Sequence, residues 1–425
     1  MPELNLGKVV GPQGPQGAVG PAGAQGVQGI QGVPGKDATI NGYNILNLSA
    51  AGAAQLTQDN DGNVVITASG ENLLDNAYFA DKNSIIDQRM GYVLIPGANY
   101  YSDSTLTDKI NTEPVSAYAT VYNVTETANY ISFKISASAT ETFYAAIGDV
   151  VRGYVGAVYT IDRWKCYTPG ASVFLTENGL AVRQAASTQG YAQLLQRLEP
   201  TLWNEIRNSG RTVTASILLS NGVLKTKSGT IPKFGSMQFH GSSYIRMNGA
   251  YTGFDMIIIG DTCPEIVAVK FELGSTQTLA HQEKDENGND VWVLNEIHDY
   301  RKELRKCQRY FVACIPQSDW PRIGFVDQHN IPQNEKYKHV VNIPLPVTMR
   351  ANPTVSFSGS LSIAVCKSGA TSAVPVESLG TVEYNGASMI SCVAITSEQI
   401  ESGYTTVLRP GDNSRRSRVY ISADP

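Results

Sequence analysis

Glycine recurs at every third position from residue 11 to residue 35, and this repeat constrains the chain more than any other feature. The nine glycines are Gly11, Gly14, Gly17, Gly20, Gly23, Gly26, Gly29, Gly32 and Gly35. A flexible linker has no need for a strict period of three, whereas a collagen-like triple helix requires it, because only a hydrogen side chain fits at the crowded axis. The sequence therefore predicts a stalk at residues 11–37 that three chains share. At ~3 Å of rise per residue this rod is roughly 80 Å long.

The stalk is weak by composition, so a second trimerising element must follow it. Few prolines pre-set its extended backbone, and it offers almost no charges for ion pairs between chains. Residues 38–70 then alternate apolar and polar side chains around Asn41-Gly42 and Asp61-Gly62, which are typical hairpin dipeptides. Because a single hairpin is only marginally stable in water, we expect a β neck here that pairs with its two copies.

Composition excludes several classes of protein. Hydrophobic residues make up 42% of the 425 residues and charged residues 17%, which is enough apolar material for folded cores. The net charge of −5 disfavours a general nucleic-acid binder, and no apolar run approaches the ~20 residues of a membrane span. The first residues contain no apolar secretory signal. We expect reduced, mostly buried thiols at Cys166, Cys263, Cys307, Cys314, Cys366 and Cys392.

From residue 72 to about residue 279 the pattern predicts a β-sandwich rather than alternating strands and helices. Short β-prone runs are separated by clusters of Gly, Asn, Asp and Ser. The expected strands are 118–122, 130–135, 171–175, 212–218, 243–247, 255–259 and 266–273. One run, YAQLLQRL at 191–198, is instead predicted to be a helix that ends before Pro200.

Six groups of residues follow one another in a characteristic order through this region. They are NLLDNAYF at 72–79, QR at 88–89, YTIDRW at 159–164, LQRLE at 195–199, GRTVTAS at 210–216 and FELGS at 271–275. Together they resemble a structural module found in the fibre and tail proteins of tailed bacteriophages. The resemblance covers about 71–311 and implies a jelly-roll sandwich akin to carbohydrate-binding modules. The stretch between Arg89 and Tyr159 is longer than the pattern requires, and we expect an inserted hairpin pair there.

The segment Asp162-Arg163-Trp164 has two interpretations. In the functional one, Trp164 is a platform for a sugar ring, with polar neighbours beside it. In the structural one, which we favour, Trp164 belongs to the core and an Asp–Arg pair fixes a strand.

Residues 296–311, EIHDYRKELRKCQRYF, form the clearest predicted helix. Ile297, Tyr300, Leu304, Cys307 and Phe311 fall on one apolar stripe. We expect this stripe to pack on the sandwich of its own chain, with a short trimeric coil as the alternative. The opposite basic face is interpreted as solvated. The phrase ELRKCQRYF resembles the closing helix of the same phage module.

Residues 316–425 are predicted to form a smaller β domain. PLPVTMRANPTV at 344–355 again resembles a pattern that follows that helix in phage fibres. Strands are expected at 356–365, 390–396 and 418–422. The basic cluster Arg415, Arg416 and Arg418 is interpreted as a guard on an edge strand, with an acidic-glycan site as the alternative.

The sequence contains little that indicates catalysis. No motif for a nucleophilic serine or cysteine, a zinc protease or a phosphate-binding loop is present, and the five histidines have no metal-ligand spacing. The acidic stretch EKDENGND at 283–290 could bind calcium, but Asn287-Gly288 indicates first a hairpin turn. We therefore expect no catalytic residue, no metal and no cofactor.

The predicted protein is a mainly β homotrimer. Its expected parts are a virion-anchoring peptide at 1–10, the collagen-like stalk at 11–37, the β neck at 38–70, the jelly-roll sandwich at 71–283, a hairpin turn and helix at 284–315, and a C-terminal β domain at 316–425. The resemblance implies a phage virion fibre that is assembled in the bacterial cytoplasm, contacts other virion proteins through its N-terminus and adheres to surface glycans. The alternatives are a head or collar decoration fibre and, less favoured, a polysaccharide-degrading enzyme.

Sugar sites usually stack rings on exposed aromatic side chains. The candidate ligand-binding residues are Tyr244, Tyr251, Trp292 and Trp320.

Overall fold

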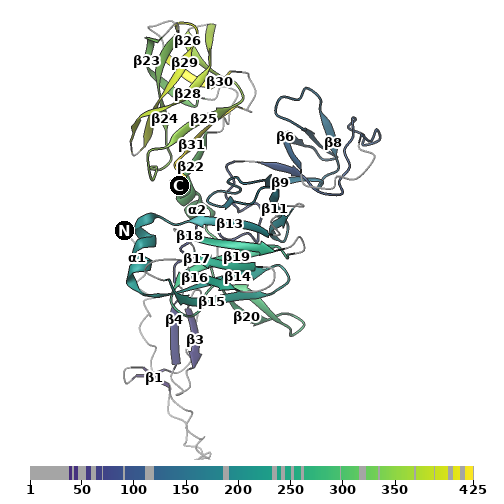
Figure 1. The fold of residues 1–425 in the computed structure, drawn as a ribbon, viewed down its shortest axis with the longest axis vertical. Coiled ribbons are helices and arrows are strands. Elements are labelled where there is room, and N and C mark those ends of the chain that lie inside the picture. Colours follow the sequence, from purple (N-terminus) through teal and green to yellow (C-terminus); the bar gives the residue numbers. More distant parts are fainter. Residues whose placement is uncertain are drawn as a thin grey trace, which may run out of the picture.

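The computed structural model shows a mainly β protein, as predicted (Figure 1). It describes residues 38–40, 43–45, 54–58, 64–68, 70–89, 91–110, 119–184, 191–231, 237–240, 245–249, 253–259, 263–296, 298–314, 322–333, 336–367, 370–386, 388–400, 405–411 and 417–424. Within these residues every strand pair is antiparallel, and there are two short helices. None of the helices found there is long and apolar enough to cross a membrane.

Two hairpins occupy the predicted neck. They pair β1 (Ala38–Ile40) with β2 (Tyr43–Ile45), and β3 (Ala54–Gln58) with β4 (Val64–Ala68). The predicted turn dipeptides, Asn41-Gly42 and Asp61-Gly62, lie outside the described residues. The nine glycines of the repeat lie outside the described residues.

Two sheets build the central unit. The first has five strands in the order β10 (Lys165–Cys166), β13 (Tyr191–Arg197), β18 (Gly253–Ile259), β17 (Ile245–Gly249) and β16 (Met237–His240). The second has ten strands in the order β15 (Leu224–Thr230), β14 (Thr212–Leu219), β19 (Ile266–Leu273), β12 (Gly179–Gln184), β11 (Ala171–Thr176), β9 (Val150–Val155), β5 (Tyr92–Leu94), β6 (Ala119–Glu126), β7 (Ile131–Lys134) and β8 (Phe143–Ala145).

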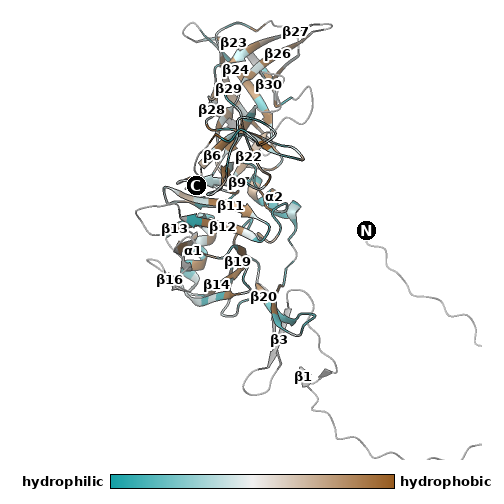
Figure 2. Cartoon of the chain, turned by 90° about the vertical axis from the view of Figure 1, so that its right-hand side faces the viewer, coloured by the Kyte–Doolittle hydropathy of each residue, from teal (hydrophilic) through white to brown (hydrophobic). Residues whose placement is uncertain are grey.

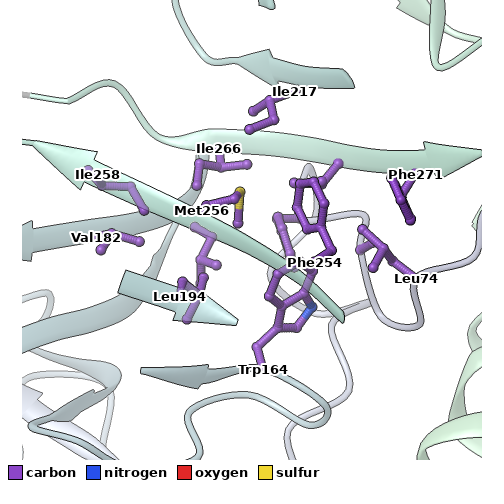
Figure 3. Close-up of a cluster of buried hydrophobic side chains, with 14 of the residues drawn as sticks. Leu74, Trp164, Val182, Leu194, Ile217, Phe254, Met256, Ile258, Ile266 and Phe271 are labelled. Atoms are coloured by element: carbon purple, nitrogen blue, oxygen red, sulfur yellow. The ribbon is translucent and has the colours of Figure 1, made fainter. Parts of the chain in front are cut away.

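The main core lies between the five-stranded sheet and the first half of the ten-stranded sheet (Figure 3). Leu194 and Met256 enter it from the smaller sheet, and Val182 and Ile217 enter it from the larger one. The fully buried Trp164 contacts other aromatic rings edge-on, among them Phe254 at a centroid distance of 6.5 Å. The expected sandwich-like packing of β layers is therefore present.

The predicted helix at 191–198 is wrong, because these residues form β13. Its burial alternates residue by residue, with Ala192, Leu194 and Gln196 facing the core. The helix follows instead as α1 (Pro200–Ser209), with Pro200 in its first turn and Gly210 in the left-handed conformation at its C-terminal cap. Proline suits the first turn of a helix because the missing N–H would have had no partner there.

The described residues between 92 and 150 extend the larger sheet into an appended lobe. Strand β5 pairs with both β9 and β6, and β7 and β8 follow at the edge. The lobe has a small core of its own, which includes Leu94, Phe133 and Phe143. In Figure 1 it projects to the side of the central unit.

Helix α2 (Tyr300–Gln308) connects the central unit to the C-terminal unit (Figure 1). It is shorter than predicted, because Asp299 caps its start and Phe311 already belongs to β22. Cys307 is fully buried, whereas Tyr300 is exposed. The side of the helix that contains Cys307 therefore packs within its own chain, which is the arrangement that we favoured from the sequence. Ile297 lies outside the described residues.

The C-terminal unit is also built from two sheets around one core. The smaller has the order β22 (Phe311–Cys314), β31 (Arg418–Ser422) and β25 (Thr354–Ser358). The larger has the order β27 (Ala370–Val376), β26 (Leu361–Lys367), β30 (Thr405–Pro410), β23 (Gly324–Gln333), β24 (Lys336–Pro344), β29 (Met389–Thr396) and β28 (Ser378–Asn385).

Two predictions for this unit need correction. The strand expected at 356–365 is split into β25 and β26 by Gly359, whose φ of 77° favours glycine. Arg418 begins β31, which lies between two partners, so it does not guard an edge strand. Arg415 and Arg416 lie outside the described residues.

Candidate functional site

Trp292 is the one predicted ligand-binding residue within the described part of the chain. It lies on β21 (Asp290–Leu294), opposite Gln282 of β20 (Ala280–Lys284). Its half-buried ring packs against a small cluster that includes Leu218 and Ala268, on the outer face of the larger sheet. Much of the ring therefore holds the β20–β21 hairpin in place, and only part of it faces solvent. Tyr244, Tyr251 and Trp320 lie outside the described residues.

The acidic stretch at 283–290 forms the turn of the β20–β21 hairpin. The Asp285 carboxylate accepts hydrogen bonds from the backbone N–H groups of Asn287 and Asn289 and from the Asn289 side chain, which lower its pKa. Gly288 has a φ of 80°, as a hairpin turn of this kind requires. Within the described ranges, no three His, Cys, Asp or Glu side chains gather in a metal-binding arrangement.

The cysteines match the prediction for unpaired thiols. All six are free; four are buried, Cys314 is half-buried and Cys366 is exposed. Burial raises the pKa of Cys392 to about 12 and that of Cys263 to about 11. Such thiols are poor nucleophiles near neutral pH, because the thiolate is the reactive form.

Trp164 is a core residue and cannot serve as an exposed platform for a sugar. It is fully buried, and its indole Nε1–H donates to the carbonyl of Asn76 at 2.9 Å. The structural interpretation of this segment is therefore confirmed, with one correction. Asp162 and Arg163 do not pair with each other but with Arg89 and Asp75, respectively.

Arg89 is the centre of a buried ionic junction where several distant segments meet. Its guanidinium forms ion pairs with Asp162 and Asp424, and it lies 3.8 Å from the centre of the Phe311 ring. The Asp162 and Asp424 side chains are only 1% and 4% exposed. Burial raises the pKa of Asp162 to about 7, although Arg89 and the hydrogen bonds from Gln88 oppose this shift.

Gln88 and Arg163 extend the junction to β22 and to Tyr310, which lies between α2 and β22. The Gln88 side-chain amide donates to the Phe311 carbonyl at 2.8 Å and accepts from the Ala313 N–H at 3.3 Å. Arg163, with a φ of 73°, places its guanidinium 3.3 Å from the centre of the Tyr310 ring. These contacts fix β22 and the residue before it on the central unit, so the junction has a structural role.

Beside this junction a hollow of about 680 Å³ opens between α2 and the loop that precedes β25. We call it the basic groove. It is lined by Asp299, Arg301, Lys302, Arg305, Lys306, Arg309, Val347 and Thr348. Figure 2 shows α2 as a hydrophilic segment. The sequence indicated the basic helix face but not the loop that turns it into a groove.

Part of the positive charge in the basic groove is neutralised by the fold. Lys306 lies 3.0 Å from a Glu303 carboxylate oxygen, and Arg309 lies 3.2 Å from one of Glu199. In the described part of the chain, Arg301, Lys302 and Arg305 have no carboxylate within ion-pair distance. Three exposed cations therefore remain available on one wall.

No family model matches the sequence, and no curated protein matches it either.

Proposed function

We propose that this chain is the subunit of a homotrimeric structural fibre of a tailed-phage virion, and that its β units adhere to host-surface glycans. The observation that carries the proposal is the uninterrupted Gly-X-Y repeat at 11–37, since this pattern serves three-chain assembly. Residues 1–10 anchor the fibre to the virion, and the stalk projects the β units outward.

The described fold supports this organisation. Hairpins follow the repeat, as a trimerising neck would require, and two sandwich-like units follow the hairpins. In Figure 1, β3 and β4 lie at the end of the molecule opposite the C-terminal unit. We assign the central unit to the jelly-roll class of carbohydrate-binding modules on the order of its resembling motifs.

Adhesion by such a fibre works through multivalency. Three copies of a weak site on one rod, and several rods on one particle, raise the apparent affinity ~10²–10⁴-fold without any new contact. Shallow glycan sites are sufficient for a fibre of this kind.

Light scattering tests the assembly. The full chain should give about 137 kDa, three times the 45.8 kDa of one chain. A chain that begins at residue 38 should give three times its own, smaller mass, if the neck and β units hold the trimer. A trimer of the full chain alone would assign trimerisation to the stalk. A monomer in both cases would refute the fibre.

Binding of the labelled full chain to bacterial cells tests adhesion. Adhesion that purified surface polysaccharide inhibits, without release of reducing sugar, is the expected result. Absence of adhesion together with antibody labelling of the phage head would indicate a decoration fibre instead. Release of reducing sugar would indicate an enzyme.

A further inference from the structure

We propose that the basic groove beside α2 binds an anionic glycan polymer, through charged groups that are phosphodiesters or carboxylates. This inference deepens the proposed adhesion and rests on it. It assigns the ligand class and places the site at the junction of the two β units, on residues other than the predicted aromatic ones.

The cations on α2 that have no carboxylate within ion-pair distance in the described part of the chain destabilise the helix. Arg301 and Arg305, and likewise Arg305 and Arg309, are four residues apart and repel each other along the helix. Arg301 and Lys302 also lie in the first turn, where the helix dipole favours negative charge. Arg301 and Lys302 stand at this unfavourable end without a described carboxylate partner, whereas Lys306 and Arg309 are paired. A bound anion would remove this repulsion.

The walls of the groove are held in place by contacts within the chain. Asp299 caps α2 by accepting from the N–H groups of Arg301 and Lys302, and the buried Cys307 holds the other side of the helix. The Arg350 N–H donates to the Arg309 carbonyl at 2.9 Å, which ties the loop to the end of the helix. A preformed site avoids the entropy cost of ordering its walls.

The spacing of the cations and the size of the groove suit a linear polymer. Cations recur along α2 at steps of four residues, which correspond to about 6 Å. A volume of about 680 Å³ is within the usual range for ligand sites of roughly 300–1,000 Å³. The half-buried Val347 gives the groove an apolar contact surface of the kind that the face of a sugar ring needs. A linear polymer with regularly spaced anionic groups fits this arrangement, and arginine forks suit both phosphate and carboxylate.

The positive charge of the groove is local. The whole chain has a net charge of −5, yet the groove lining contains five basic residues and one acidic residue. A protein with a general affinity for nucleic acid would carry a broader basic surface. This contrast favours a glycan over a nucleic acid.

The test uses the full chain and its triple variant Arg301→Gln/Lys302→Gln/Arg305→Gln. These side chains are exposed, and no described carboxylate pairs with them, so near-UV circular dichroism should remain unchanged. The matched control is Arg211→Gln/Lys225→Gln/Lys227→Gln, which removes the same charge around β14 and β15. The probes are poly(glycerol phosphate), polygalacturonate, neutral dextran and single-stranded DNA.

We expect calorimetry to show binding of at least one anionic glycan, weakened by salt, and at least a tenfold loss in the triple variant but not in the control. Preference between the two glycans identifies the charged group as phosphodiester or carboxylate. Equal binding by the triple variant and the full chain, no binding of either glycan, or tighter binding of DNA than of both glycans would overturn the proposal.

Measurements on the same samples distinguish a failure of the groove assignment from a failure of the proposed fibre. If the triple variant still forms the trimer and still adheres to cells, the fibre remains and the groove assignment fails. If light scattering shows a monomer while glycan binding depends on the three cations, the groove assignment remains and the fibre fails.

Discussion

Replacing Arg89 with methionine would remove the cation that lies between Asp162 and Asp424. Both carboxylates are almost fully buried, so neither can regain water when the guanidinium is lost. Breaking a buried ion pair by removing one partner costs about 3–5 kcal/mol, because an uncompensated charge remains. We expect a loss of this size in the free energy of unfolding at pH 8.5.

The cost should be smaller at pH 5, because burial raises the pKa of both carboxyl groups. A carboxyl group whose pKa is higher in the folded state than the unfolded value of ~3.9 favours folding in its protonated form. That contribution is present at low pH and is lost as the pH rises through the folded pKa, which is about 7 for Asp162. Without Arg89 this pKa rises further, so at pH 5 Asp162 is neutral. The remaining cost comes from Asp424, which has lost its cation, and from the lost contact with the Phe311 ring, so it should be smaller than the cost at pH 8.5.

Urea unfolding followed by tryptophan fluorescence measures the effect, since Trp164 and Trp203 are both buried. Lys82→Met is the control, because the Lys82–Glu177 pair is exposed and its loss should leave the midpoint unchanged. An equal penalty at pH 5 and pH 8.5 for the Arg89 variant would refute the electrostatic explanation and assign the whole effect to packing.

Three further predictions concern packing and thiol access. Trp164→Ala should destabilise the chain by about 3–5 kcal/mol in urea unfolding, because the cavity lies in the main core; a loss below 1 kcal/mol would contradict that placement. Gly153→Ala should lower Tm in calorimetry, because a Cβ there would lie 2.6 Å from the Phe174 Cβ, whereas Gly380→Ala meets open space and should leave Tm unchanged. A thiol reagent should label one cysteine per chain rapidly, and Cys366→Ser should abolish that rapid phase, since Cys366 is the exposed thiol; rapid labelling of several thiols would contradict the described burial.

The strands were predictable where apolar and polar residues alternate, and the failure at 191–198 has a specific cause. Leu194, Leu195 and Leu198 fit a helical period, while the strand period requires Gln196 on the buried face. Gln196 is buried because its side chain accepts from the Asp75 N–H and donates to the Asp75 carbonyl. Because this buried residue is polar, the sequence does not show the alternation of apolar and polar residues that is typical of a strand. The neighbouring residues in the sequence also give no indication that Asp75 is its partner.

The candidate site was less predictable than the fold. The candidate sugar-binding residues were chosen only because their side chains are aromatic. The Trp292 side chain is half-buried beneath its own hairpin. The basic face of α2 was visible in the sequence, but its other wall comes from Val347 and Thr348. Grooves made by segments distant in the chain depend on tertiary packing, and no local pattern encodes them.

Strand β31 has a consequence for synthesis. It lies between β22 and β25, and its backbone supplies the hydrogen bonds that both of them use. A ribosome that has reached residue 410 has therefore made both outer strands and no strand to place between them. Edges of this kind are ready to pair with other chains. Neighbouring nascent chains on one messenger RNA are thus exposed to mispairing until residues 418–422 emerge from the exit tunnel.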